Sequence, residues 1–106
     1  DGCLWAFTDE EFRKLDDHMK DQPLFNASVV RLQRIICAGA ADVSPDPQGR
    51  IAIPQNLRDY AKIDKEATFV GAGSKVEIWA RSRWDELMGA ITDDMIGEAA
   101  REIGLG

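Results

Sequence analysis

The stretch "SPDPQGRIAIPQNLRDY" (residues 44–60) places an aspartate four residues before an arginine, directly ahead of a short apolar run. The prolines on either side of Asp46 restrict the residues that precede them to extended backbone. Asp46 can accept hydrogen bonds from amides of the turn, and Gly49 can supply a positive φ. We therefore predict a tight turn that presents the side chain of Arg50.

The residues that follow the turn predict short strands and one short helix. Residues 50–53 alternate apolar and polar positions, which predicts a strand with both isoleucines on one face. Pro54 ends that strand and suits the first turn of a helix over residues 55–61. Residues 67–73 and 75–80 predict a second pair of strands, with Gly71 and Gly73 at the turn between them.

The residues that precede the turn predict a helix and then a strand. Asn26 is a suitable N-cap for a helix through Val30 and Gln33. Arg31 and Arg34 lie at helical spacing on it, and this pair is either a solvated basic face or a phosphate contact. The β-branched and small residues 35–43 predict a buried strand, with Gly39 at a bulge or a close backbone approach.

Residues 1–15 can be laid on residues 73–87 at an offset of 72 positions. Each copy contains a short apolar strand that ends in an aromatic residue, then a helix with a large aromatic side chain in its first turn. Thr8 and Glu11 fit a capping box in the first copy. Helical spacing predicts two apolar stripes packed in the core, namely Phe12, Leu15 and Met19 in the first copy and Trp84, Leu87, Met88 and Ile91 in the second.

The repeat is incomplete within the chain. The second copy is preceded by the D-x-x-G-R turn, whereas the matching part of the first copy would lie before Asp1. We therefore expect the chain to begin inside a repeat and to be N-terminally truncated.

The 106 residues are 44% hydrophobic and 30% charged, as expected for one soluble domain, and the net charge is −6. Residues 26–65 alone carry a net charge of +2, because this segment contains six basic and four acidic residues. This segment is the part of the chain best suited to an anionic partner. The apolar run 35–41 is too short to span a bilayer, so we expect no membrane partner. Cys3 and Cys37 form no C-x-x-C pair, and we predict two buried reduced thiols.

The sequence argues against an enzyme. His18, the one histidine, lies among charged residues of a helix and is expected to face solvent. No cluster of histidine, cysteine and carboxylates has metal-ligand spacing, and no serine lies in a nucleophile-elbow pattern. The G-x-G at residues 71–73 lacks the strand-to-helix context of a phosphate loop. We expect no metal and no cofactor.

Three segments together resemble the second half of the MraZ family of bacterial transcriptional regulators. They are "DPQGRIAIPQNLRDYAKI" (46–63), "FVGAGSKVEIW" (69–79) and "RWDEL" (83–87). Residues 1–15 resemble the end of the first half of the same family, and "RIICAGAADVSPD" (34–46) resembles the entrance to its second half. The resemblance covers residues 1 to about 90.

The resemblance implies an α+β fold with a mainly β core, namely a swapped-hairpin β-barrel of the AbrB/SpoVT type with short peripheral helices. Residues 1–22 would end a first AbrB-like module that lacks its D-x-x-G-R part. Residues 23–90 would form the second module, and residues 91–106 a helical tail. The tail reads as a short amphipathic helix through Met95, Ile96, Ala99 and Ile103.

The resemblance also implies a function. Family members assemble into rings and bind repeated short DNA motifs upstream of the division and cell-wall gene cluster, mainly as repressors in the cytoplasm at the nucleoid. The family's DNA-contacting arginine falls on Arg50, and its structuring aspartate falls on Asp46, beside Gly49. Arg31, Arg34 and Arg58 are candidate phosphate contacts. The expected partners are double-stranded DNA and further copies of the chain.

Two alternatives compete with this interpretation of the turn. From the residues alone, Asp46 can fix the turn through backbone hydrogen bonds, or it can pair directly with Arg50. In the second case the motif is a surface turn with a local ion pair, which is worth little for stability. The second alternative concerns the function of the whole chain, which could be an AbrB-like protein-interaction or antitoxin-type module without independent DNA binding.

Overall fold

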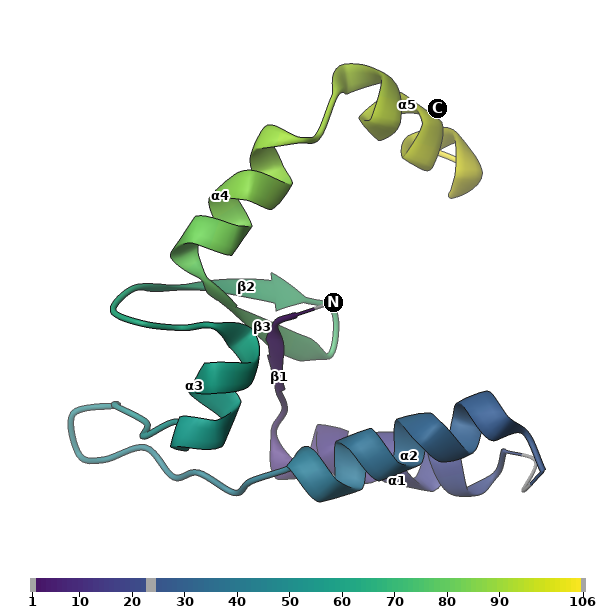
Figure 1. Ribbon diagram of the computed structural model, residues 1–106. Coiled ribbons are helices and arrows are strands. Elements are labelled where there is room, and N and C mark those ends of the chain that lie inside the picture. Colours follow the sequence, from purple (N-terminus) through teal and green to yellow (C-terminus); the bar gives the residue numbers. More distant parts are fainter. Residues whose placement is uncertain (1, 23–24, 106) are drawn as a thin grey trace.

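The computed structural model describes residues 2–22 and 25–105. Along the described residues, three helices separate the first strand from the second and third, and two helices follow (Figure 1). Their order is β1 (Leu4–Ala6), α1 (Asp9–Lys20), α2 (Ala27–Gly39), α3 (Gln55–Ala61), β2 (Ala67–Ala72), β3 (Lys75–Ala80), α4 (Arg81–Gly89) and α5 (Asp93–Glu102).

The strands form a three-stranded antiparallel sheet in the order β1-β3-β2. β2 and β3 make the predicted hairpin, paired from Ala67 opposite Ala80 to Ala72 opposite Lys75. Gly73 lies at the turn with a φ of 70°, a conformation that favours glycine. Gly71 was also predicted at the turn, but it lies within β2 and pairs with Val76.

The two copies of the sequence repeat meet where the edge strand β1 pairs with the central strand β3. Trp5 of β1 lies directly opposite Glu77 of β3, and these residues are equivalents at the offset of 72 positions. An antiparallel ladder centred on equivalent residues relates the two strands by a local two-fold rotation. The helices that follow, α1 and α4, begin at equivalent positions, 9 and 81. The division into AbrB-like modules at residues 1–22 and 23–90 stays a prediction.

The aromatic residues of the repeat pack alike in both copies. The ring centroids of Phe7 and Phe12 are 6.0 Å apart, and those of Trp79 and Trp84 are 5.9 Å apart. Each pair joins the end of a strand to the first turn of the next helix. Such aromatic pairs contribute roughly 0.5–1.5 kcal/mol beyond the area they bury, so the repeat is a packing unit at both strand-helix junctions.

The hydrophobic core lies between the sheet and α3. Leu4, Ile78 and Ala61 are buried there, and Ile53 and Leu57 pack against them. The helix 55–61 was predicted from Pro54, which lies at its N-cap. This core is small, because most other large apolar side chains of the described residues stay at least partly exposed.

Helices α1 and α2 form a hairpin that lies side by side below the sheet in Figure 1. Thr8 Oγ1 accepts a hydrogen bond from the Glu11 amide at 3.2 Å, which is one half of the predicted capping box. Asn26 caps α2 as predicted, because its Oδ1 accepts from the amides of residues 28 and 29. Gln33 Nε2 donates to the Met19 carbonyl at 2.9 Å and ties the two helices together.

Two predicted strands are wrong. Residues 35–39 continue α2, and residues 40–46 have no regular structure. The helix that begins at Asn26 continues because residues 29, 33 and 36 keep helical spacing toward α1. Gly39 accordingly ends a helix and does not mark a bulge. Residues 50–53 are not assigned to the sheet, because no described strand pairs with them.

The predicted packing holds for the first apolar stripe and fails for much of the second. Met19 is buried and Phe12 and Leu15 are half-buried, whereas Leu87, Met88 and Ile91 are exposed. No described element covers that side of α4. The two thiols also differ, since Cys3 is buried as predicted and Cys37 is exposed, contrary to the prediction, and both are free.

The fold class α+β is confirmed, with a small sheet at its centre and helices around it. The sheet is open, and the swapped-hairpin barrel stays a prediction. The accessible surface is 8481 Å², against roughly 5,900 Å² for a compact monomer of this mass. The radius of gyration is 16.3 Å, against about 13 Å for a compact domain of this length. Among the described residues, no helix is long and apolar enough to cross a membrane.

Candidate nucleic-acid interface

The D-x-x-G-R motif forms a closed turn. The Gly49 amide donates to the Asp46 carbonyl at 2.9 Å, and the Asp46 amide donates to the Arg50 carbonyl at 2.8 Å. Gly49 has a φ of 80°, and a Cβ at this position would meet nothing within 4 Å. Glycine is therefore required by the backbone conformation and not by lack of space. The arrangement matches the three-residue hairpin loop that ends in a left-handed residue.

The Asp46 carboxylate holds this turn from inside. Its Oδ1 accepts from the Gln48 amide at 2.9 Å and from the Arg50 amide at 2.8 Å. Asp46 and Arg50 form no ion pair among the described residues, whose ion pairs take their cations from elsewhere, namely Lys14, Lys20, Lys75 and Arg81. Of the two interpretations of the motif, backbone fixation is the one observed.

Arg50 is exposed at the end of the turn, and its backbone is held at both the amide and the carbonyl. No hydrogen bond or ion pair of its guanidinium is found within residues 2–22 and 25–105. A planar guanidinium presents five N–H donors that match carboxylate, phosphate or a guanine edge. The turn thus combines a rigid backbone with a cationic side chain that stays available to a ligand.

Arg58 lies on α3, a few residues after the turn, in a local chain of hydrogen bonds. Its Nη2 donates to Gln55 Oε1 at 2.6 Å, and Gln55 Nε2 donates to Asp59 Oδ1 at 2.7 Å. The Arg58 Nε is buried and has no hydrogen-bond partner among the described residues. Nη2 is therefore committed to the fold and Nε is covered by it, so Nη1 is the nitrogen through which Arg58 would contact an anion.

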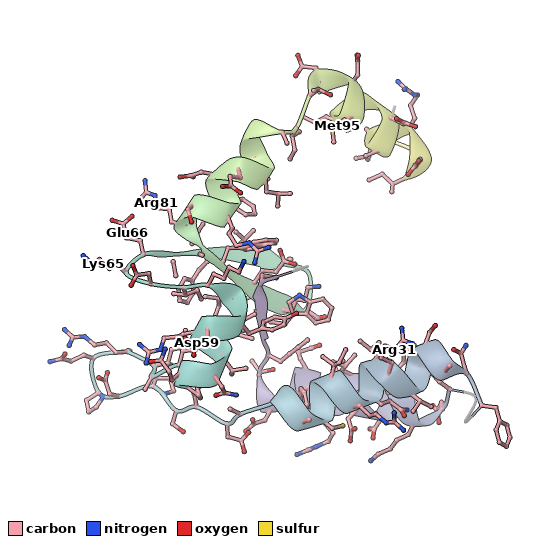
Figure 2. All side chains as sticks on the ribbon, viewed as in Figure 1. Arg31, Asp59, Lys65, Glu66, Arg81 and Met95 are labelled. Atoms are coloured by element: carbon pink, nitrogen blue, oxygen red, sulfur yellow. The ribbon has the colours of Figure 1, made fainter. Side chains whose placement is uncertain are left out.

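Arg31 and Arg34 lie on α2 and are exposed. Figure 2 shows Arg31 near the beginning of α2, on the opposite side of the molecule from the segment that contains the turn. The structure therefore does not bring Arg31 together with Arg50. These predicted phosphate contacts are divided between two separate surfaces, one at the turn with Arg58 and one on α2.

The acidic charge is concentrated away from the turn. α1 carries five carboxylates and α5 carries four. Within α1, Lys20 Nζ lies 3.1 Å from Asp16 Oδ2, and this hydrogen bond raises the pKa of Lys20 above its ordinary value of 10.5. An acidic chain can bind a polyanion only through a surface that such helices avoid, and the turn and α3 offer one.

A cluster around Trp5 was not predicted from the sequence. Lys75 Nζ lies 3.6 Å from the centroid of the Trp5 ring and 3.8 Å from Glu77 Oε2. Trp79 Nε1 donates to Glu77 Oε1 at 3.2 Å. The only signal in the sequence was the repeat, which makes Trp5 and Glu77 equivalents. The cluster fastens β1 to β3 and offers no nucleophile.

A hollow of about 590 Å³ lies beside α4 and is lined by Glu77, Trp79, Arg83, Glu86 and Leu87. The Arg83 guanidinium also donates to the Gly2 carbonyl at 3.4 Å, so it braces the start of β1. No group of three or more histidine, cysteine or acidic residues is gathered as a metal would require within the described ranges.

Comparison with known proteins now places the chain. Residues 36–105, which contain the turn, match the family model described as "MraZ protein, putative antitoxin-like". The transcriptional regulator MraZ of Clavibacter michiganensis is 41% identical over 103 residues, which are 97% of this chain and 71% of that protein. The chain belongs to the MraZ family. A MraZ regulator of Clostridium beijerinckii is 41% identical over 106 residues, and one of Lachnoclostridium phytofermentans is 47% identical over 85 residues.

Family membership extends to the first copy of the repeat. The match with the Clostridium beijerinckii relative covers 99% of this chain and 75% of that protein, so it includes β1 and α1 as well as the turn. The chain spans about seven-tenths to three-quarters of the Clavibacter and Clostridium beijerinckii relatives. The MraZ resemblance read from the motifs is therefore confirmed.

Proposed function

We propose that this MraZ-family chain is a sequence-specific DNA-binding transcriptional regulator that reads DNA with Arg50. The observation that supports the proposal is the turn itself. Asp46 Oδ1 accepts hydrogen bonds from two backbone amides, and the guanidinium of Arg50 has no partner among the described residues. The names of the curated relatives point to the same class of function.

The chemistry of reading follows from the geometry of the guanidinium. Arg50 donates to the O6 and N7 atoms of a guanine in the major groove, and such a bidentate pair is worth about 1–3 kcal/mol of discrimination. A side chain that starts from a fixed backbone loses less freedom on binding than one on a mobile loop. Arg58 contacts a phosphate beside it and fixes the orientation of the turn on the duplex.

One arginine per copy binds weakly, so the proposal includes assembly of several copies into a ring. Linked copies raise the effective concentration of neighbouring turns without any new contact. The accessible surface exceeds that of a compact monomer by roughly 2,500 Å², which favours partners of some kind. Repeated turns then match repeated operator motifs. In this proposal the chain represses the division and cell-wall gene cluster and acts in the cytoplasm at the nucleoid.

The first experiment replaces Arg50 by alanine and measures binding to promoter DNA by fluorescence anisotropy. We expect the affinity for operator repeats to fall at least tenfold, toward that for scrambled DNA, because each copy loses its base contact. Arg13→Ala on α1 is the matched control, since it removes an equally exposed arginine away from the turn. Unchanged operator binding by Arg50→Ala, with DNA binding present in the parent chain, would refute the assignment.

The family model's description, which includes the words "antitoxin-like", favours a second candidate, a protein-binding module without its own DNA binding. In that case the exposed apolar side chains of α4 and α5 would meet a different protein. Arg50→Ala would then leave the binding of that partner protein intact. A parent chain that fails to bind promoter DNA at any salt concentration would support this alternative.

A further inference from the structure

Helix α5 exposes an apolar face that the described residues do not cover. Thr92 Oγ1 caps the helix by accepting from the Met95 amide at 3.2 Å. The side chains of Ile96 and Ile103 are nonetheless 57% and 73% exposed. A helix of ten residues is marginal in water without a packed face. Asp93 and Glu102 flank this face, whereas Asp94 and Glu98, each two residues from Ile96, lie about half a turn away from it.

Helix α2 exposes a second apolar face with the opposite charge. Its inner side carries Gln33, which bonds to α1. On its outer side Leu32 and Ile35 are 45% and 59% exposed, with Arg31 and Arg34 beside them. No acidic residue occurs between Ala27 and Gly39. The outer side of α2 is therefore apolar and purely cationic, whereas α5 is apolar and mainly anionic.

We propose that α5 of one copy packs on the outer face of α2 of a second copy. Ile96 and Ile103 cover the apolar side chains of the outer side of α2. Asp93 and Glu102 face the two arginines of α2. Within one chain α2 and α5 lie at separate ends of the molecule (Figure 1), so the contact joins copies. Each copy offers both faces, so a contact between unlike faces passes from copy to copy, and it forms a ring when the rotation between copies closes.

The chain leaves more surface open than a compact monomer does, by roughly 2,500 Å². A standard interface buries about 800 Å² on each partner, so surface is open for contacts between copies. The inference rests on the self-association included in the proposed function, and it is independent of how Arg50 meets DNA. It assigns Arg31 and Arg34 to assembly in place of phosphate contact.

The contact can be tested by reversing the charges on α2 and on α5 separately and then combining the two sets of changes, which should rescue assembly. Arg31→Glu with Arg34→Glu, and separately Asp93→Lys with Glu102→Lys, should each raise the dissociation constant of assembly about 100-fold, since juxtaposed like charges cost several kcal/mol. All four changes in one chain restore opposite charges and should return the assembly to its original size. Light scattering after gel filtration measures the mass, and circular dichroism verifies that each variant is folded.

The controls separate the contact from assembly in general. Arg13→Glu with Lys65→Glu reverses two exposed cations outside both faces and should leave the mass unchanged. An original chain that is monomeric at micromolar concentration overturns self-association and this contact together. A folded Arg31→Glu/Arg34→Glu chain that still assembles, or a fourfold variant that stays monomeric, overturns the contact alone. Loss of DNA binding by Arg31→Glu/Arg34→Glu with assembly intact assigns these arginines to phosphates and also overturns it.

Discussion

The turn at Asp46–Arg50 and helix α5 are both exposed, but they are exposed for opposite physical reasons. The turn is polar, and four hydrogen bonds involving Asp46 hold its backbone. Helix α5 has a single side-chain cap and presents isoleucines to water. A fixed polar feature needs no covering and can select a polar ligand, whereas an apolar face is stable only when another surface covers it. The two exposed regions thus suit two different kinds of partner.

The largest expected effect is a difference in the free energy of unfolding between a variant in the core and a variant on α5. Ile78→Ala removes a buried side chain from the contact between sheet and α3 and should lower the free energy of unfolding by about 2–5 kcal/mol. Ile96→Ala should lower the unfolding stability of the separated chain by less than about 0.5 kcal/mol and weaken assembly. Urea denaturation at low chain concentration measures both changes. Similar losses for the two variants would mean that α5 is part of the monomer's core.

An intermediate effect should come from loosening the turn while the reading side chain stays. Asp46→Ala removes the acceptor of two amide hydrogen bonds, each worth about 1 kcal/mol. We expect operator affinity to fall roughly tenfold with the melting temperature nearly unchanged, because the turn lies outside the core. Asp42→Ala, an exposed carboxylate just before the turn, is the matched control. A loss of stability that matches the loss of affinity would contradict the view of the turn as an independent unit.

The smallest effect concerns the two thiols. Burial raises the pKa of the Cys3 thiol above its ordinary value of 9.0, and the charge of Glu77 acts in the same direction. Cys3 therefore stays protonated and slow toward iodoacetamide at pH 8, while the exposed Cys37 reacts. The raised pKa means that Cys3 contributes its full stability below pH 9, and that this contribution falls as the pH rises through the folded-state pKa.

Mass spectrometry of the native chain checks the thiols by counting alkylated sites with time. One fast site should be found in the parent chain and none in Cys37→Ser. Two fast-reacting thiols in a folded chain would show that β1 leaves the sheet readily. The first copy of the repeat would then be as weakly held to the core as we expect α5 to be.

Much of the local structure was predictable because it depends on short-range chemistry. The caps at Thr8 and Asn26 were readable, since a side-chain oxygen needs only the amides two or three residues ahead. The turn was readable for the same reason, because proline, aspartate and glycine act on their immediate neighbours. The repeat predicted equivalent strand-helix units, and the structure places Trp5 opposite Glu77 where β1 pairs with β3.

The errors arose where an apolar run fits two structures. Residues 35–43 are β-branched and small, yet residues 35–39 prolong α2 and residues 40–43 have no regular structure. Helical spacing continues the packing against α1, and none of the described strands pairs with this segment. Residues 50–53 alternate like a strand, but their backbone pairs with none of the described strands. The stripe on α4 has the right spacing for burial, yet Leu87 and Met88 stay 42% and 40% exposed.

The sequence by itself determined that the chain belongs to the MraZ family, that a turn between Asp46 and Gly49 carries Arg50 at its end, and that Thr8 and Asn26 cap helices. These features depend on contacts within a few residues. Only the tertiary structure decided that Asp46 bonds to amides and forms no ion pair with Arg50, that Arg31 lies apart from the turn, and which apolar faces stay open. Those outcomes depend on what packs against what across the whole chain, and spacing along a sequence does not record the absence of a neighbour.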